Sequence, residues 1–367
     1  MFASLIIGWG AEVLAIHISV GIALAILAWL QTAPEFAVEA VIAWSRDSNL
    51  VLANFTGSLR LLMGLGWPMV FFIYWYTSKR RGTKVNHVQL QKNFAVETAG
   101  LFLSVLYFTV VWATGAWSAI DGMILCGLYL VYLWLLNRQR KAGIENPHES
   151  TEDEGWVVRK ITSLSKKKQF LAAIGIFVVG GGILLLTVHP FLDALKGCAV
   201  YLGVSEFVFI QWIAPIASEF PEKVTAFNWA RKPKKVPLAI INMLSSIVSQ
   251  WTLLAGLVPI IYSISAGQMS TIILTDFQKT EVLLTITQSA LAVVFLLDLK
   301  ITALEMAGLF ILWAIQFLMP SSRELLIYVY GVWIVGEFIR LSLKPAQLLV
   351  PKVVASLFLK KQPAAAS

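Results

Sequence analysis

The chain has 367 residues, of which 58% are hydrophobic and only 14% are Asp, Glu, Lys or Arg. Soluble domains carry about a quarter charged residues, so this composition excludes an ordinary soluble protein. The formal net charge is +8, but the basic residues gather in short loops between apolar runs, which argues against nucleic-acid binding.

Apolar runs long enough to cross a bilayer recur along the whole sequence. A transmembrane helix needs about 20 predominantly apolar residues, and a helix satisfies its own backbone hydrogen bonds in lipid. We therefore predict an all-α polytopic membrane protein with about ten transmembrane helices. The predicted spans lie near residues 17–44, 50–77, 93–113, 117–136, 169–188, 204–230, 236–263, 280–297, 301–319 and 324–342.

Basic clusters follow the second, fourth and sixth predicted spans, at 79–84, 138–141 and 231–235. Cytoplasmic loops of membrane proteins carry an excess of Lys and Arg, so we predict that all three clusters face the cytoplasm. The N-terminus would then be cytoplasmic, in an integral protein of the plasma membrane. No basic leader or polar cleavage boundary typical of a secretory signal is evident at the start of the sequence.

Two similar motifs lie on either side of a polar segment, 138–168. The first is LQTAPEFAVEAVIAW from Leu30 and the second is ASEFPEKVTAFNW from Ala217, so that the two Pro-Glu pairs match. The predicted topology gives the two motifs opposite orientations across the membrane. We therefore predict inverted repeats over 1–137 and 169–320, a cytoplasmic linker over 138–168, and an additional transmembrane helix with a tail over 321–367.

The Pro-Glu pairs are the strongest candidates for a functional site. Inverted repeats with helices interrupted near the midplane are typical of secondary transporters, and Pro34 and Pro221 would each break a helix there. A buried ionisable group normally faces a partner, a cavity or an ion, and carboxylates suit hard cations such as calcium. We predict that Glu35 and Glu222 line one cation site; the alternative is that each is paired internally for stability.

Further polar residues lie near these carboxylates. Glu39 and Glu219 share a helical face with the main acids and would be extra ligands, proton carriers or lining residues of an aqueous vestibule. The spans that follow supply neutral oxygens, and helix packing is the alternative role for each of them. These candidates are Asn54, Ser58, Asn242 and Ser246, with Thr56, Ser245, Ser249 and Gln250 close by.

The two motifs, with the spans that follow them, resemble the α-repeats of the calcium/cation antiporter superfamily, sodium/calcium exchanger type. In that family each repeat carries Gly-Thr-Ser-x-Pro-Glu and then Asn-x-x-Gly-Ser-Asn. The resemblance extends to about residue 320. It implies exchange of calcium or a related cation against sodium or protons, with Glu35 and Glu222 as principal ligands and no bound cofactor.

The chain departs from the family pattern in both repeats. Gly-Thr-Ser is replaced at 30–32 and at 217–219, and the last Asn of the second motif is missing from both halves. Asn54 can be matched either with Asn242 or with Ser246. The counterpart of the span at 169–188 would end near Met1, so the first helix of the family is expected to be missing.

Arg60 lies ten residues into a predicted span, which places it near the midplane. A buried arginine must find a partner, and we expect Glu35, Glu39 or Glu222 to provide it. Arg60 could then replace one transported cation. Alternatively it could plug the site, leaving a non-transporting scaffold or regulatory protein with the exchanger fold.

Sequence motifs of enzymes are missing. Neither His-Glu-x-x-His nor a phosphate-binding P-loop occurs, and the four histidines are scattered. We therefore predict that the protein is not an enzyme and that its transport is not driven by ATP.

Overall fold

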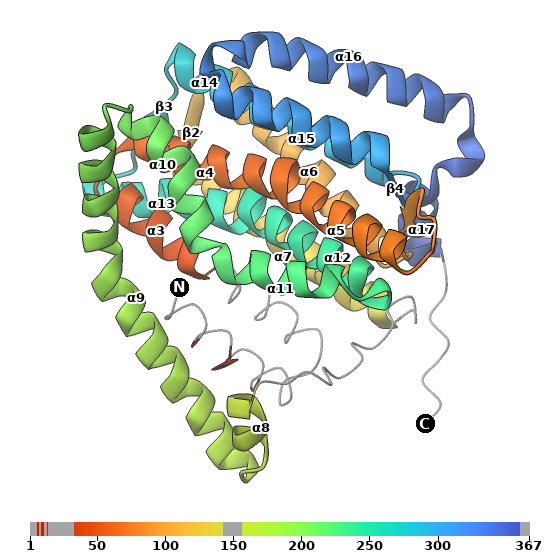
Figure 1. Ribbon diagram of the computed structural model, residues 1–367. Coiled ribbons are helices and arrows are strands. Elements are labelled where there is room, and N and C mark those ends of the chain that lie inside the picture. The colour runs from red at the N-terminus through yellow and green to blue at the C-terminus, as the bar shows by residue number, and fades with distance from the viewer. Residues whose placement is uncertain (1–5, 7–8, 11–12, 14–32, 142–155, 360–367) are drawn as a thin grey trace.

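The structure is a computed structural model, and it describes residues 6, 9–10, 13, 33–141 and 156–359. The chain forms a bundle of long helices (Figure 1). The elements of the first half are α3 (Ala33–Trp44), α4 (Ser48–Leu61), η1 (Leu62–Gly66), α5 (Trp67–Arg80), β1 (His87–Gln89), α6 (Phe94–Thr114), β2 (Ala116–Ser118) and α7 (Ala119–Lys141).

The second half repeats this order, and three helices precede the repeated elements. Those three are α8 (Trp156–Thr162), α9 (Lys166–Leu202) and α10 (Glu206–Ser218). The repeated elements are α11 (Phe220–Ala230), α12 (Val236–Ser249), η3 (Gln250–Leu254), α13 (Ala255–Ala266), β3 (Thr271–Ile273), α14 (Asp276–Leu296), β4 (Lys300–Thr302) and α15 (Ala303–Leu318). Two further helices, α16 (Arg323–Ser342) and α17 (Leu349–Leu359), complete the described chain.

The all-α polytopic fold predicted from the sequence is confirmed. In the described part of the chain, seven helical segments are long and apolar enough to cross a membrane. They are Ser48–Arg80, Phe94–Thr114, Ala119–Gln139, Lys166–Leu202, Pro233–Ala266, Asp276–Leu296 and Pro320–Ser342. Shorter apolar helices, α10, α15 and α17, lie beside them.

Some predicted spans differ from the observed helices. The span at 204–230 is two helices, because α10 ends at Ser218 and α11 begins at Phe220. Of the span at 17–44, residues 33–44 form α3, and residues 17–32 lie outside the described residues. The sequence did not predict α17.

The two halves are related by an approximate two-fold axis that inverts one relative to the other. Strand β1 pairs antiparallel with β4, and β2 pairs with β3, so each small sheet joins strands from both halves. Helix α3 packs on α13 just as its counterpart α11 packs on α5, and α7 packs on α13 as α15 packs on α5. Figure 1 shows β2 and β3 at one end of the bundle and β4 at the other.

A π-helical segment interrupts the equivalent long helix of each half. Segment η1 begins at Leu62 and η3 begins at Gln250, each eight residues after an asparagine, Asn54 or Asn242. π-Helical turns inside α-helices are rare and often occur at functional sites. Their matching positions resolve the register of the repeats, with Asn54 equivalent to Asn242.

An aromatic cluster holds the centre of the bundle together across the two halves. The ring of Phe55 lies edge-on to Trp251 at 5.4 Å, and Phe108 lies 5.0 Å from the same indole. Trp117 packs on both phenylalanine rings. Since Phe55 follows Asn54 directly, this buried cluster fixes the part of α4 that carries polar side chains.

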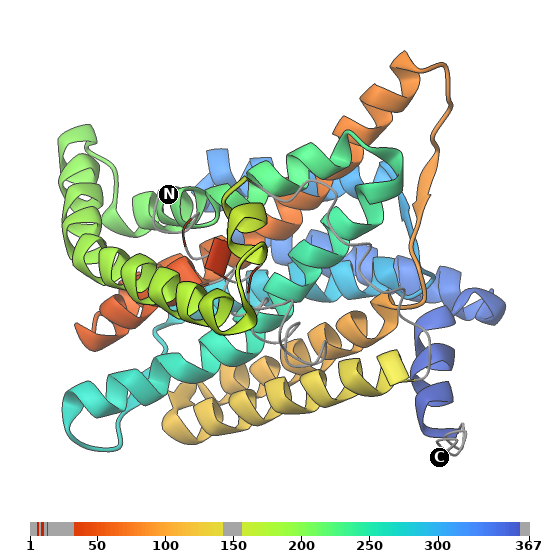
Figure 2. The same cartoon turned by 90° about the horizontal axis from the view of Figure 1, so that it is seen from below.

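The basic loops meet at one end of the bundle. Arg81 donates from Nη2 to the backbone oxygen of Arg231 at 3.3 Å, which joins the loops after α5 and α11. The β1·β4 pair brings Lys300 to the same end. Figure 2 shows the bundle from below, with α9 running obliquely along one side.

Candidate functional site

The helix break between α10 and α11 places two acidic side chains in the interior. Glu219 lies at the junction of the two helices, and Glu222 lies in the first turn of α11 beside Pro221. In the other half, Glu35 and Pro34 occupy the first turn of α3. Backbone N–H groups at the start of a helix favour nearby negative charge, so the junction is a suitable place for a carboxylate.

Asn54 connects the two acids of the first half. Its Nδ2 donates to Glu35 Oε1 at 3.1 Å and to Glu39 Oε2 at 2.5 Å. All three side chains are buried, with exposed fractions of 1% or less. Glu39 lies one turn after Glu35 on α3, so both acids point toward α4.

The equivalent asparagine of the second half makes the equivalent contact. Asn242 Nδ2 donates to Glu222 Oε1 at 3.3 Å, and Ser246 Oγ donates to the same oxygen at 2.7 Å. Each Pro-Glu carboxylate is therefore hydrogen-bonded by the asparagine of the helix that follows it.

Glu219 and Ser218 join the two halves. Ser218 Oγ donates to Glu35 Oε2 at 2.7 Å. Glu219 Oε1 accepts from Ser58 Oγ on α4 and, at 2.9 Å, from Gln250 Nε2 at the start of η3. Glu219 also interacts electrostatically with both Glu35 and Glu222. The four acids, Glu35, Glu39, Glu219 and Glu222, are called the carboxylate cluster below.

Lys223 provides a positive charge inside this cluster. Its ammonium forms an ion pair with Glu219 Oε2, one turn earlier in the chain, and the lysine side chain is only 12% exposed. Lys223 therefore offsets part of the negative charge of the carboxylate cluster.

The predicted partner of Arg60 is wrong. Arg60 Nη2 lies 2.5 Å from Glu281 Oε2, on α14, and not next to Glu35, Glu39 or Glu222. Residues two apart on a helix face in different directions, so Ser58 points to Glu219 while Arg60 points away from the cluster. Arg60 therefore does not occupy the candidate ion site.

Arg60 belongs instead to a second buried polar group, which we call the Arg60 network. Glu281 pairs with both Arg60 and Arg323, and Gln211 Nε2 donates to its Oε2 at 2.8 Å. Gln316 Oε1 accepts from Arg60 Nη1 at 3.1 Å. The guanidinium also lies 5.3 Å from the centre of the Trp212 ring, a favourable cation–π distance.

The sequence did not identify Ser218 or the members of the Arg60 network other than Arg60 and Thr56. Ser218 was not singled out because hydroxyl side chains are common in membrane helices, and Glu281 lies at the predicted start of its span. Three glutamines in apolar spans could have indicated the network, because a carboxamide inside an apolar span needs a partner. They are Gln211, Gln288 and Gln316. Gln288 does bond within the network, accepting from Gln316 Nε2 at 3.0 Å.

Not every predicted neutral ligand reaches the carboxylate cluster. Thr56 Oγ1 accepts from Arg60 and from Gln211, and Ser245 Oγ lies 3.5 Å from the hydroxyl of Tyr132. Asn54, Ser58, Asn242, Ser246 and Gln250 do contact the acids. Across the described residues, no three His, Cys, Asp or Glu side chains are arranged to hold a metal ion in this conformation.

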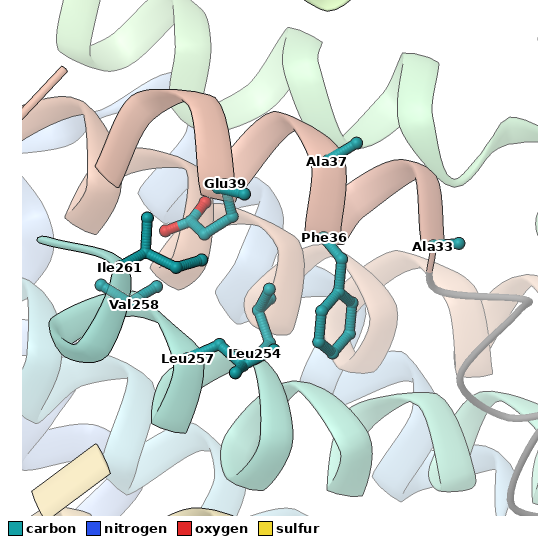
Figure 3. A pocket seen from close by; sticks show the side chains of 9 residues that line it. Ala33, Phe36, Ala37, Glu39, Leu254, Leu257, Val258 and Ile261 are labelled. Carbon is teal, nitrogen blue, oxygen red and sulfur yellow. The ribbon is translucent and has the colours of Figure 1, made fainter. Parts of the chain in front are cut away.

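Two buried oxygens beside the cluster lack a hydrogen-bond donor. Among the described residues, neither Asn54 Oδ1 nor Glu39 Oε1 has a partner. Glu39 also borders an apolar cavity of about 240 Å³ between α3 and α13, where it lies near Val258 and Ile261 (Figure 3). A buried acceptor without a donor is costly, and a bound cation, proton or water at these atoms would relieve that cost.

Comparison with known proteins assigns the family. The family described as "Sodium/calcium exchanger protein" matches residues 1–137 and 172–321. The chain is similar to the crystal structure of the H⁺/Ca²⁺ exchanger CAX, with 33% identity and a TM-score of 0.86 over 97% of this chain and 88% of that chain.

More distant structures share the fold. The sodium-calcium exchanger NCX_Mj, soaked with 2.5 mM Na⁺ and 10 mM Sr²⁺, has 17% identity and a TM-score of 0.54 over 87% of this chain and 94% of that chain. No curated protein matches the sequence. The family match covers most of the chain and agrees with its inverted repeats, so the protein belongs to the sodium/calcium exchanger family.

Proposed function

We propose that this protein is a secondary antiporter that exchanges calcium, or a related divalent cation, across the membrane against protons. Sodium is the alternative counter-ion. The observation that supports the site most directly is the matched pairing of Asn54 with Glu35 and of Asn242 with Glu222. Inverted repeats in transporters carry their substrate site where the repeats meet.

The chemistry of the carboxylate cluster suits a hard divalent cation. Calcium takes about six to eight oxygen ligands, drawn from carboxylates, carboxamide oxygens and water. The cluster offers four carboxylates, and the unpartnered Oδ1 of Asn54 lies among them. The neighbouring donors hold these oxygens in place until a cation replaces some of the hydrogen bonds.

Protons are favoured as the counter-ion by the relative with 33% identity, which is an H⁺/Ca²⁺ exchanger. Buried carboxylates that repel one another can be neutralised either by a divalent cation or by protons, and antiport follows if the two states alternate. The non-transporting alternative required Arg60 in the ion site, and Arg60 pairs with Glu281 instead. We therefore do not propose it.

The end of the bundle that carries the basic loops would face the cytoplasm, with the protein in the plasma membrane. Its surroundings are the lipid bilayer and the transported inorganic cations. No nucleic acid, cofactor or enzymatic reaction forms part of this proposal.

Purified protein in proteoliposomes would test the function. Calcium, strontium, manganese and magnesium uptake would be followed with an imposed proton gradient, with a sodium gradient, and with neither. We expect proton-driven calcium flux that Glu35→Gln combined with Glu222→Gln abolishes, whereas Glu324→Gln, a change at an exposed acid, leaves it unchanged. Undiminished flux in the double variant would contradict the site, and no flux of any cation under either gradient would contradict the transport proposal.

A further inference from the structure

Lys223 holds a cation position within the carboxylate cluster. Its ammonium is paired with Glu219 Oε2, while Glu219 Oε1 accepts hydrogen bonds from Ser58 and Gln250. Both oxygens of Glu219 are therefore occupied, and its side chain is 3% exposed. A transported ion that binds this carboxylate therefore meets an ammonium already paired with it.

The lysine is able to move. Its ammonium is a compact charge on a flexible four-carbon stem, unlike the planar fork of arginine. Its side chain is more exposed than that of Glu219, at 12%. It lies in the first turn of α11, next to Glu222, so a change of its rotamer takes the charge out of the cluster without moving the helix.

We propose that Lys223 is a tethered competitor of the transported cation, and that it keeps weakly binding monovalent ions from occupying the site at their working concentrations. This inference rests on the cation-exchange function proposed above. Because the lysine is attached to the helix that carries Glu222, its effective concentration at Glu219 is high. A free monovalent ion carries the same charge and gains no Coulomb energy by replacing it.

A divalent ion differs in this respect. It carries twice the charge, and the Coulomb energy between two ions scales with the product of their charges. A divalent ion can therefore displace one ammonium and still gain attraction to the remaining acids. Competition from Lys223 lowers the affinity for every cation by the same factor. Sodium or potassium, which bind more weakly, then no longer occupy the site at their working concentrations, whereas calcium still does. The lysine thus sets how much sodium the site tolerates and is not itself a ligand.

Calcium binding to the purified full chain would test the proposal by titration calorimetry at one fixed pH. Each titration is done in choline chloride and again in sodium chloride of equal ionic strength. For the native protein we expect the same calcium Kd in both salts. For Lys223→Gln we expect calcium to bind at least tenfold more tightly in choline, and sodium to weaken it by fivefold or more.

Three other variants complete the experiment. Lys234→Gln, the same change at an exposed lysine of the basic loop, should behave as the native protein does. Lys223→Arg keeps the charge and should show no sodium effect. Lys223→Met also removes the charge but keeps a long unbranched side chain, so it remains a usable test if Lys223→Gln fails to fold, and it should show the same sodium effect as Lys223→Gln.

The outcomes separate the two proposals. If the calcium Kd of Lys223→Gln stays within twofold of the native value and sodium has no effect on it, the competitor role is wrong. The proposed function would still be supported if Glu222→Gln loses calcium binding. A sodium effect of equal size in the native protein would also contradict the competitor role. If the native protein binds none of calcium, strontium, manganese or magnesium, both proposals fail.

Discussion

Ser58 and Arg60 lie two residues apart on α4 and contact different acids: Ser58 Oγ donates to Glu219, whereas Arg60 pairs with Glu281. One helix therefore carries two polar faces. Asn54 and Ser58 face the carboxylate cluster, and Thr56 and Arg60 face the Arg60 network, because residues four apart share a face. The two groups should make separable contributions, one to cation binding and one to stability.

The Arg60 network contains two guanidinium groups and one carboxylate, so its members are not equivalent. Glu281→Gln leaves the buried Arg60 and the partly exposed Arg323 without a counter-charge and should destabilise the protein by about 3–5 kcal/mol. Arg60→Met leaves the pair of Glu281 and Arg323 intact and should cost less. Thermal unfolding in detergent measures both changes.

The same variants test the separation of the two polar groups. Folded Arg60→Met protein should bind calcium within twofold of the native Kd, because Arg60 contacts no member of the carboxylate cluster. A large loss of calcium affinity, or a cost for Arg60→Met as large as that for Glu281→Gln, would show that Arg60 acts on the ion site after all.

Gly57 allows α4 and α10 to approach closely. A Cβ atom at this position would lie 1.8 Å from the backbone oxygen of Gln211, which cannot move as a flexible side chain would. Gly57→Ala should therefore separate the helices and destabilise the protein by about 1–3 kcal/mol. Since Ser58 follows directly, calcium affinity should fall as well.

Gly127→Ala is the matched control, because no heavy atom lies within 4 Å of its added Cβ. Alanine is the better helix former by about 1 kcal/mol, so this change on α7 should be neutral or stabilising. If Gly57→Ala and Gly127→Ala shift the melting temperature by the same amount, the close approach at Gly57 is contradicted.

The two asparagines should differ in importance although they are equivalent by symmetry. Asn54 donates to two acids, whereas Glu222 keeps the hydrogen bond from Ser246 when Asn242 is removed. A hydrogen bond to a charged group contributes about 1.5–3 kcal/mol. We expect Asn54→Ala to weaken calcium binding by about 10- to 100-fold and Asn242→Ala by less than tenfold, as measured by calorimetry. The reverse order would contradict the assignment of Asn54 as the common donor.

Sequence patterns predicted the fold better than they predicted the partners of buried polar side chains. The matched Pro-Glu pairs and the alternating basic loops were enough for the inverted repeats, because hydropathy and charge bias are properties of local sequence. The partner of Arg60 depends on how α4 packs on α14, because Arg60 and Glu281 are 221 residues apart in the sequence. The π-helical segments, which resolve the register, arise from tertiary packing and leave no clear signal in composition.

Glu39 has no acidic counterpart in the second repeat, since matching Pro34 with Pro221 aligns Glu39 with Ala226. Its Oε2 accepts from Asn54, and its Oε1 is unpartnered among the described residues. The residue borders the apolar cavity between α3 and α13. An apolar lining cannot replace the hydration shell of calcium, whereas a proton reaches a carboxylate through a few water molecules. We therefore expect Glu39 to serve the counter-ion more than the divalent cation. Glu39→Gln should keep the calcium Kd within about tenfold of the native value and slow proton-driven uptake in proteoliposomes. Glu222→Gln, in contrast, should abolish calcium binding. Equal loss of calcium binding in both variants would instead make Glu39 a calcium ligand.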